Sequence, residues 1–190
     1  GASGIATAKL LLKAGIEDII LVDKNGALVS GDETLNDPQK EMAKITNKEL
    51  KKGTLEEVIK GRDVFIRLSE ENLVTKEMVE SMNEDPIIFA LANPTPEIKP
   101  EIAKEAGARV IATGGPSYPN QINNILVFPG LFKGLLEAKE TYVTYGVMIA
   151  VSKKLASLVE NPTAEKIIPG VFDGDIVKSV SETVVKNIEK

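Results

Sequence analysis

The stretch GASGIATAKLLLKAGIEDIILVD (residues 1–23) places a glycine-spaced turn, an apolar helix and an apolar strand one after another. Apolar residues recur at helical spacing from Gly4 to Lys13, and Ala14-Gly15 ends that pattern. DIILVD (residues 18–23) is a short apolar run closed by an acid, which is typical of a strand buried on both faces. The stretch therefore predicts a parallel α/β sheet that begins with a turn, a helix and a strand.

The turn has the spacing of a phosphate-binding loop. Gly1 and Gly4 match the second and third glycines of a G-x-G-x-x-G motif. In this motif glycine lets the backbone of the turn approach a pyrophosphate that lies at a helix N-terminus. Here that backbone is the one around Ser3. The first glycine and the strand before it would lie upstream of residue 1. We expect the chain to begin inside the motif and to lack the first strand of the sheet, and therefore not to fold independently.

Asp23 supplies the second half of a dinucleotide site. It ends the apolar strand roughly 20 residues after the turn, where a carboxylate can bind the ribose hydroxyls. Asp23 could also be a strand-end residue before the turn Lys24-Asn25-Gly26, and the two roles are compatible. An acid at this position favours NAD, whereas the neighbouring Lys24 leaves NADP as the alternative.

The chain continues with alternating helices and strands. Further strands are predicted at residues 63–69, 86–93 and 108–115, and a shorter one at 125–128; helices are predicted at 38–43, 54–61, 75–82 and 100–106. From Leu131 the pattern is helical, at 131–138, 147–159 and 176–188. We expect one dinucleotide-binding domain over residues 1–190: a doubly wound, mostly parallel, Rossmann-like part (1–130) and a C-terminal helical segment (131–190).

The composition excludes several kinds of catalytic site and of binding partner. The 190 residues contain no cysteine and no histidine, which excludes thiolate and imidazole catalysis and metal sites built from those ligands. A net charge of −5 argues against a general binder of nucleic acid or of anionic membranes. There is no apolar run of the roughly 20 residues that span a bilayer. These features are typical of a cytoplasmic protein.

Several longer motifs carry a family resemblance. They are LVDKNG (21–26), DVFIRLSEENLVTKEMV (63–79), FALANPTPEI (89–98), YPNQINNILVFPG (118–130) and EKIIPGVFD (165–173). Together and in this order they resemble the NAD-binding domain of malic enzymes, the bacterial-type malate oxidoreductases. The resemblance covers the whole chain and implies oxidative decarboxylation of malate to pyruvate and CO2 by the full-length protein, and a homodimer.

The resemblance also implies roles for single residues. Asn93 and Asn124 match asparagines that lie beside malate and the nicotinamide ring, and Ser69 matches a serine close to the cofactor. Asn120, Gln121 and Asn123 are expected to shape their loop. The resemblance assigns no catalytic or metal-binding residue to this chain: the base, the acid and the ligands of Mg or Mn belong to an upstream domain, so the segment alone is expected to be inactive.

Two loops depart from the family pattern. The turn at Arg67–Asn72 is bulkier and more acidic than the usual glycine-containing turn, and Gly115, Pro116 and Ser117 replace an arginine, a serine and an acid. These changes put full catalytic competence in question, and two alternatives to a malic enzyme stay open. One is another NAD-dependent dehydrogenase of the same fold, and the other is a catalytically inactive nucleotide-binding regulatory domain.

Overall fold

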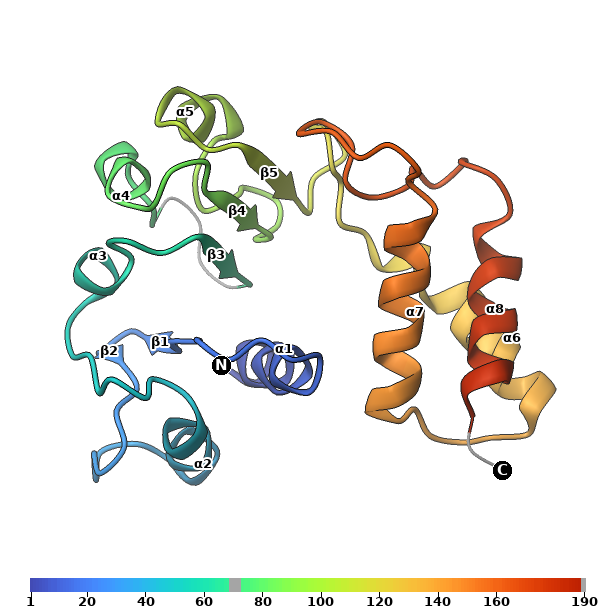
Figure 1. Cartoon of the computed structure of the whole chain (residues 1–190), viewed down its shortest axis with the longest axis horizontal. Helices are drawn as coiled ribbons and strands as arrows, with labels where there is room; N and C mark the ends of the chain where they lie inside the picture. Colours follow the sequence, from blue (N-terminus) through green and yellow to red (C-terminus); the bar gives the residue numbers. More distant parts are fainter. Residues whose placement is uncertain (69–72, 189–190) are drawn as a thin grey trace. The chain divides into compact units, whose positions relative to one another are not determined.

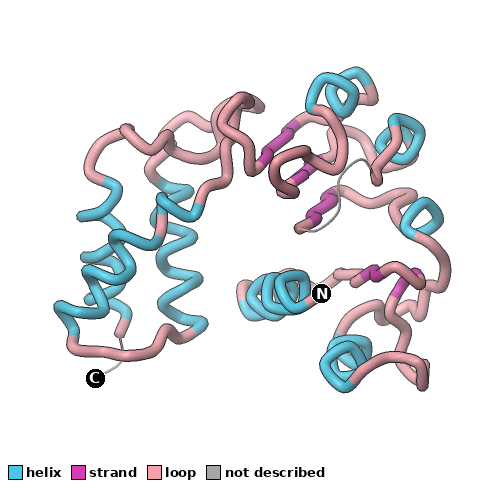
Figure 2. The backbone as a smooth tube through the Cα atoms, turned by 180° about the vertical axis from the view of Figure 1, so that it is seen from behind, coloured by secondary structure: helices cyan, strands magenta, loops and turns pink. Residues whose placement is uncertain are grey.

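The computed structural model describes residues 1–68 and 73–188 and divides the chain into two compact units, Gly1–Val110 and Ile111–Lys190. Figure 1 shows the elements of each unit, and Figure 2 gives the same backbone from behind, coloured by secondary structure. The predicted single domain over residues 1–190 stays a prediction. Within the described ranges, none of the helices combines the length and apolarity needed to cross a membrane.

The first unit opens with α1 (Ala2–Lys13), followed by β1 (Val22–Asp23) and β2 (Gly26–Ala27). The two short strands form an antiparallel hairpin in which Val22 pairs with Ala27 and Asp23 with Gly26. Gly26 has a φ of 117°, and a Cβ there would lie 2.6 Å from the carbonyl oxygen of Gly53, so the hairpin requires glycine at this position. The turn predicted at Asn25-Gly26 is therefore present.

The strand expected over residues 18–23 differs from the prediction. Only Val22 and Asp23 are paired, and Ile19 to Val22 are half-buried rather than enclosed on both faces. The physical reason is that, among the described residues, β1 has β2 as its one hydrogen-bonded neighbour. A strand paired along one edge by a two-residue hairpin arm does not reach the burial of an inner parallel strand.

Parallel strands joined by helices make up the rest of the sheet structure. Between α2 (Asp37–Ile45) and α5 (Pro100–Glu105) the chain forms α3 (Leu55–Val58), β3 (Val64–Arg67), α4 (Lys76–Glu80) and β4 (Ile87–Ala90). The register of β3 on β4 runs from Val64 opposite Ile87 to Arg67 opposite Ala90. With β5 (Val110–Thr113), inside which the unit boundary falls, the strand order is β3-β4-β5. The predicted α/β class is confirmed.

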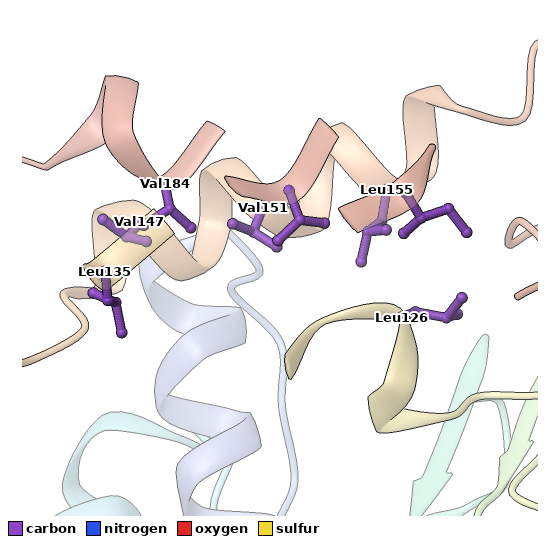
Figure 3. Packing of buried hydrophobic residues seen from close by; sticks show 8 residues of the cluster. Leu126, Leu135, Val147, Val151, Leu155 and Val184 are labelled. Atoms are coloured by element: carbon purple, nitrogen blue, oxygen red, sulfur yellow. The ribbon is translucent and has the colours of Figure 1, made fainter. Parts of the chain in front are cut away.

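The second unit is a helical assembly. After the 3-10 helix η1 (Asn124–Leu126), the chain forms α6 (Phe128–Ala138), α7 (Tyr145–Ser157) and α8 (Ile176–Asn187), and α8 packs against both α6 and α7. The core between them is aliphatic (Figure 3) and comprises Leu126, Leu135, Val147, Val151, Leu155, Ile176, Val180 and Val184.

The strand predicted at residues 125–128 is wrong. These residues form the end of η1 and the beginning of α6. The side chain of Asn123 accepts a hydrogen bond from the N–H of Ile125, and Pro129 lies in the first turn of α6, where proline favours a helix. The short apolar run therefore turns into a helix instead of joining the sheet.

Candidate functional site

The N-terminus of α1 is the first part of the predicted dinucleotide site. Its N-cap is Gly1, which provides no side-chain hydrogen bond, so within the described residues no side chain satisfies the first N–H groups of this helix. Gly1, Ala2 and Ser3 are exposed. Uncapped N–H groups and the positive end of the helix dipole together attract an anion.

Both glycines of the turn leave open space. A Cβ built on Gly1 or on Gly4 meets no atom within 4 Å of the described chain, and the φ of Gly4 is not positive. Nothing in the described chain therefore requires glycine at these two positions, in contrast to Gly26. The room that a side chain would fill is available to a phosphate group.

Asp23 lies at the end of β1 and is half-buried. Its Oδ1 accepts a hydrogen bond of 2.8 Å from the N–H of Asn25, which is the turn role considered above. Its Oδ2 accepts a second one, also 2.8 Å long, from Nε2 of Gln39. Because a carboxylate offers about four lone-pair sites, the two oxygens keep acceptor capacity for ribose hydroxyls.

Gln39 belongs to the N-terminal capping box of α2. Asn36 Oδ1 accepts from the N–H of Gln39, and Gln39 Oε1 accepts from the N–H of Asn36, both at 3.0 Å. Proline at the start of the helix and Asn36 as N-cap are visible in the sequence LNDPQK. Sequence reasoning did not connect Gln39 to Asp23, since the two residues lie 16 positions apart.

Asn93 follows β4 and is exposed, and no hydrogen bond of its side chain is present in the described part of the chain. The peptide bond between Asn93 and Pro94 is cis. Glu97, four residues on, is fully buried: its Oε2 accepts from the N–H of Ala92 at 3.1 Å, while its Oε1 has no hydrogen-bond partner among the described residues. The Asn93 amide is thus exposed on a turn that a buried carboxylate supports from within.

The asparagine-rich loop divides into structural and exposed residues. The buried Asn120 joins three backbone groups: its Nδ2 donates to the carbonyl oxygens of Ile111 and Ala164, and its Oδ1 accepts from the N–H of Ile167. Gln121 forms an isolated parallel bridge with Thr113, and Asn123 caps η1. These contacts agree with the expectation that Asn120, Gln121 and Asn123 shape the loop. Asn124 is exposed, with no side-chain hydrogen bond within residues 1–68 and 73–188.

The structure brings some of the predicted site residues together. Gly1, Ser3 and Gly4 share the first turn of α1, and Asp23 belongs to the same unit. Asn93 lies in the first unit and Asn124 in the second. Ser69, like the rest of residues 69–72, lies outside the described residues. Among the described residues, no group of three acidic side chains is arranged to hold a metal ion.

Dinucleotide-binding domains are the class of parallel α/β protein in which a glycine turn begins a helix and an acid ends the next strand. The first unit of this chain has both features. The family described as "Malic enzyme, NAD binding domain" matches residues 4–190, and the chain belongs to it.

Known proteins agree with this placement. The chain is 47% identical to the bifunctional malic/malolactic enzyme of Bacillus subtilis and 46% identical to the NAD-dependent malic enzyme of Geobacillus stearothermophilus. In each case 98% of the chain is aligned, to 46% and 39% of the relative. The crystal structure of the NAD-dependent malic enzyme of Thermotoga maritima superposes with a TM-score of 0.92 and 40% identity, over 97% of this chain and 49% of that one. The chain thus spans half or less of the length of these proteins.

Proposed function

We propose that this chain binds NAD and serves as the cofactor-binding domain of an enzyme that oxidises and decarboxylates malate to pyruvate and CO2. The observation that carries the proposal is that one unit of a chain of the malic enzyme family contains both an uncapped, glycine-flanked helix N-terminus and the Asp23 carboxylate at the end of the next strand. The relatives include both NAD-dependent and NADP-dependent malic enzymes, so the preference for NAD over NADP rests on the Asp23 carboxylate.

The residues present fit a dinucleotide. The backbone N–H groups of Ser3 and Gly4 would donate to the pyrophosphate, and the missing Cβ atoms of Gly1 and Gly4 would leave room for it. The Asp23 oxygens would accept hydrogen bonds from the ribose hydroxyls, and their negative charge would oppose a 2′-phosphate. Together these residues would hold the pyrophosphate and one ribose of the dinucleotide.

On the family resemblance, we assign Asn93 and Asn124 each to malate and the nicotinamide. A neutral amide there donates to a malate carboxylate and accepts from the nicotinamide carboxamide, which orients both without adding charge. Ser69 is assigned to the cofactor on the resemblance alone. When bound, NAD supplies the hydride acceptor and a divalent metal, Mg or Mn, supplies Lewis acidity. The metal ligands, the general base and the general acid belong to parts of the enzyme beyond these residues.

The activity test uses the full-length protein. Purified enzyme with malate, NAD and Mg or Mn is expected to produce NADH and pyruvate in equal amounts, with a higher kcat/KM for NAD than for NADP. Lactate is measured in the same assay because one relative is named a malic/malolactic enzyme. Size-exclusion chromatography with light scattering tests the proposed homodimer. Absence of malate turnover, with NADH binding retained, would favour the two alternatives: another NAD-dependent dehydrogenase of the same fold, or an inactive nucleotide-binding domain.

A further inference from the structure

We propose that Gln39 is a positioning residue for the dinucleotide: it holds the Asp23 carboxylate in the orientation that receives the ribose hydroxyls and so sets the affinity for NAD. This inference rests on the proposed function, because it concerns the same site. It adds a residue that the glycine turn and the acid at the strand end do not reveal.

The hydrogen bonds of Gln39 fix the direction of its side-chain amide. Oε1 accepts from the N–H of Asn36 at 3.0 Å, and Nε2 donates to Oδ2 of Asp23 at 2.8 Å. Rotating the amide by half a turn would set Oε1 against a carboxylate and Nε2 against an N–H group, and both hydrogen bonds would be lost. The capping box therefore delivers an N–H donor at one defined place.

Asp23 is held from two sides by different elements. Gln39, from α2, binds Oδ2, while the N–H of Asn25, from the hairpin turn, binds Oδ1. With one bond on each oxygen, the plane of the carboxylate is fixed before a ligand arrives. A ribose offers two adjacent hydroxyls, so a fixed pair of oxygens binds it with less loss of side-chain freedom than a rotating pair.

Lys40 and Asn36 lie next to Gln39 in sequence or in the capping box, but neither forms a hydrogen bond or ion pair with Asp23 among the described residues. Lys40, the next residue of α2, forms an ion pair with Glu33 at 3.1 Å, so its charge is partly balanced within the chain. Asn36, the other residue of the capping box, is exposed to solvent on the turn before α2. Gln39 is thus a direct contact between α2 and Asp23, and an exchange that keeps the helix cap should act mainly on the carboxylate.

Gln39→Glu separates the two roles of the residue. A glutamate at this position keeps an oxygen for the N–H of Asn36, as Glu57 does for the N–H of Thr54 in the capping box of α3 at 2.7 Å. It has no N–H to donate to Asp23 and places a second negative charge beside it. The helix cap is retained while the support of the carboxylate is lost.

The experiment measures NADH binding by fluorescence in the full-length protein, for wild type, Gln39→Glu, Asp23→Ala and the double variant. Glu57→Gln is the matched control, because it makes the reverse exchange in the other capping box. We expect Gln39→Glu to raise the Kd for NADH about tenfold and the KM for NAD similarly, with kcat within about twofold. Glu57→Gln should leave the Kd unchanged, and Gln39→Glu should add nothing once Asp23 is alanine.

The outcomes separate this inference from the function on which it rests. If wild type does not bind NADH, or Asp23→Ala binds as wild type does, the proposed dinucleotide site itself fails. If Asp23→Ala weakens binding but Gln39→Glu stays within twofold of wild type, the positioning role is overturned. It is also overturned if Gln39→Glu weakens binding equally with and without the Asp23 carboxylate, because the effect would then arise elsewhere.

Discussion

Two buried asparagines, Asn47 and Asn120, hold loops to the rest of their own units. Both have a left-handed backbone, with φ of 46° and 55°, which asparagine tolerates better than most residues. Asn47 Nδ2 donates to the carbonyl oxygens of Leu28 and Lys51, and its Oδ1 accepts from the N–H of Lys51. Each of these side chains makes three hydrogen bonds to backbone groups that would otherwise need water as a partner. Some of these groups are distant in sequence, and the others belong to a sharp turn.

Asn120→Ala is expected to destabilise the protein by about 2–4 kcal/mol, because it leaves part-buried backbone groups of Ile111, Ala164 and Ile167 without partners and keeps a strained φ. Urea denaturation of the full-length protein measures this loss. Asn187→Ala is the control: its side chain makes an exposed hydrogen bond to its own helix, and the change should cost under about 1 kcal/mol. Equal losses for the two variants would contradict the structural role of Asn120.

At the scale of elements, the contact between α6 and α8 depends on two glycines one helical turn apart. A Cβ on Gly130 would lie 2.6 Å from Cβ of Val180, and one on Gly134 would lie 2.6 Å from Cβ of Val184. The backbone of α8 is equally close, with the carbonyl oxygens of Val177 and Ser181 at 2.8 Å from these positions. The two helices therefore approach more closely than any side chain would allow.

Gly134→Ala should consequently destabilise the second unit by about 1–3 kcal/mol, since α6 and α8 must move apart in a packed core. Gly146→Ala is a matched control in α7, where the nearest atom to a new Cβ is 3.6 Å away. There the better helix propensity of alanine should leave stability unchanged or slightly higher. Thermal melts measure the Tm of both variants. A Gly134→Ala variant as stable as Gly146→Ala would refute the close packing of α6 against α8.

The capping box of α3 has a pH dependence with a defined sign. Hydrogen bonds from the backbone and then the side chain of Thr54 hold the pKa of Glu57 below its ordinary value of 4.5. A carboxyl whose pKa is lower in the folded state stabilises that state above the ordinary pKa, and this stabilisation is lost as pH falls through the lowered pKa.

The stability advantage of wild type over Glu57→Gln is therefore expected to be constant above the ordinary pKa and to shrink as pH falls below it. NMR titration of the Glu57 side chain measures the pKa directly, and melts of both proteins across the same pH range measure the advantage. A Glu57 pKa at or above 4.5 would contradict the capping geometry.

At the scale of the molecule, ligand binding and stability are linked. A ligand that binds the folded state alone raises the free energy of unfolding by about 2.7 kcal/mol at a concentration one hundred times its Kd. NADH is therefore expected to raise the Tm of the full-length wild-type protein, and to raise it less for Asp23→Ala at the same concentration. Differential scanning fluorimetry with a series of NADH concentrations measures both shifts. Equal shifts for the two proteins would place the ligand away from Asp23.

The sequence alone was sufficient for features that are local or periodic. Helix α1, helix α3 after Thr54, the turn at Asn25-Gly26 and the strands β3 and β4 follow from residue spacing and turn chemistry, which act over a few positions. The same reasoning identified Gly1, Gly4 and Asp23 as candidates, and the family resemblance was confirmed.

Contacts between distant positions were decided by the tertiary structure. Whether residues 18–21 are enclosed depends on which strands lie beside them, and whether residues 125–128 form a strand depends on a cap and a proline that favour a helix. The support of Asp23 by Gln39, the buried Asn47 and Asn120, and the glycine contact of α6 with α8 join residues far apart in the chain. Local patterns cannot specify such pairs, because their energies arise only when packing brings the partners together.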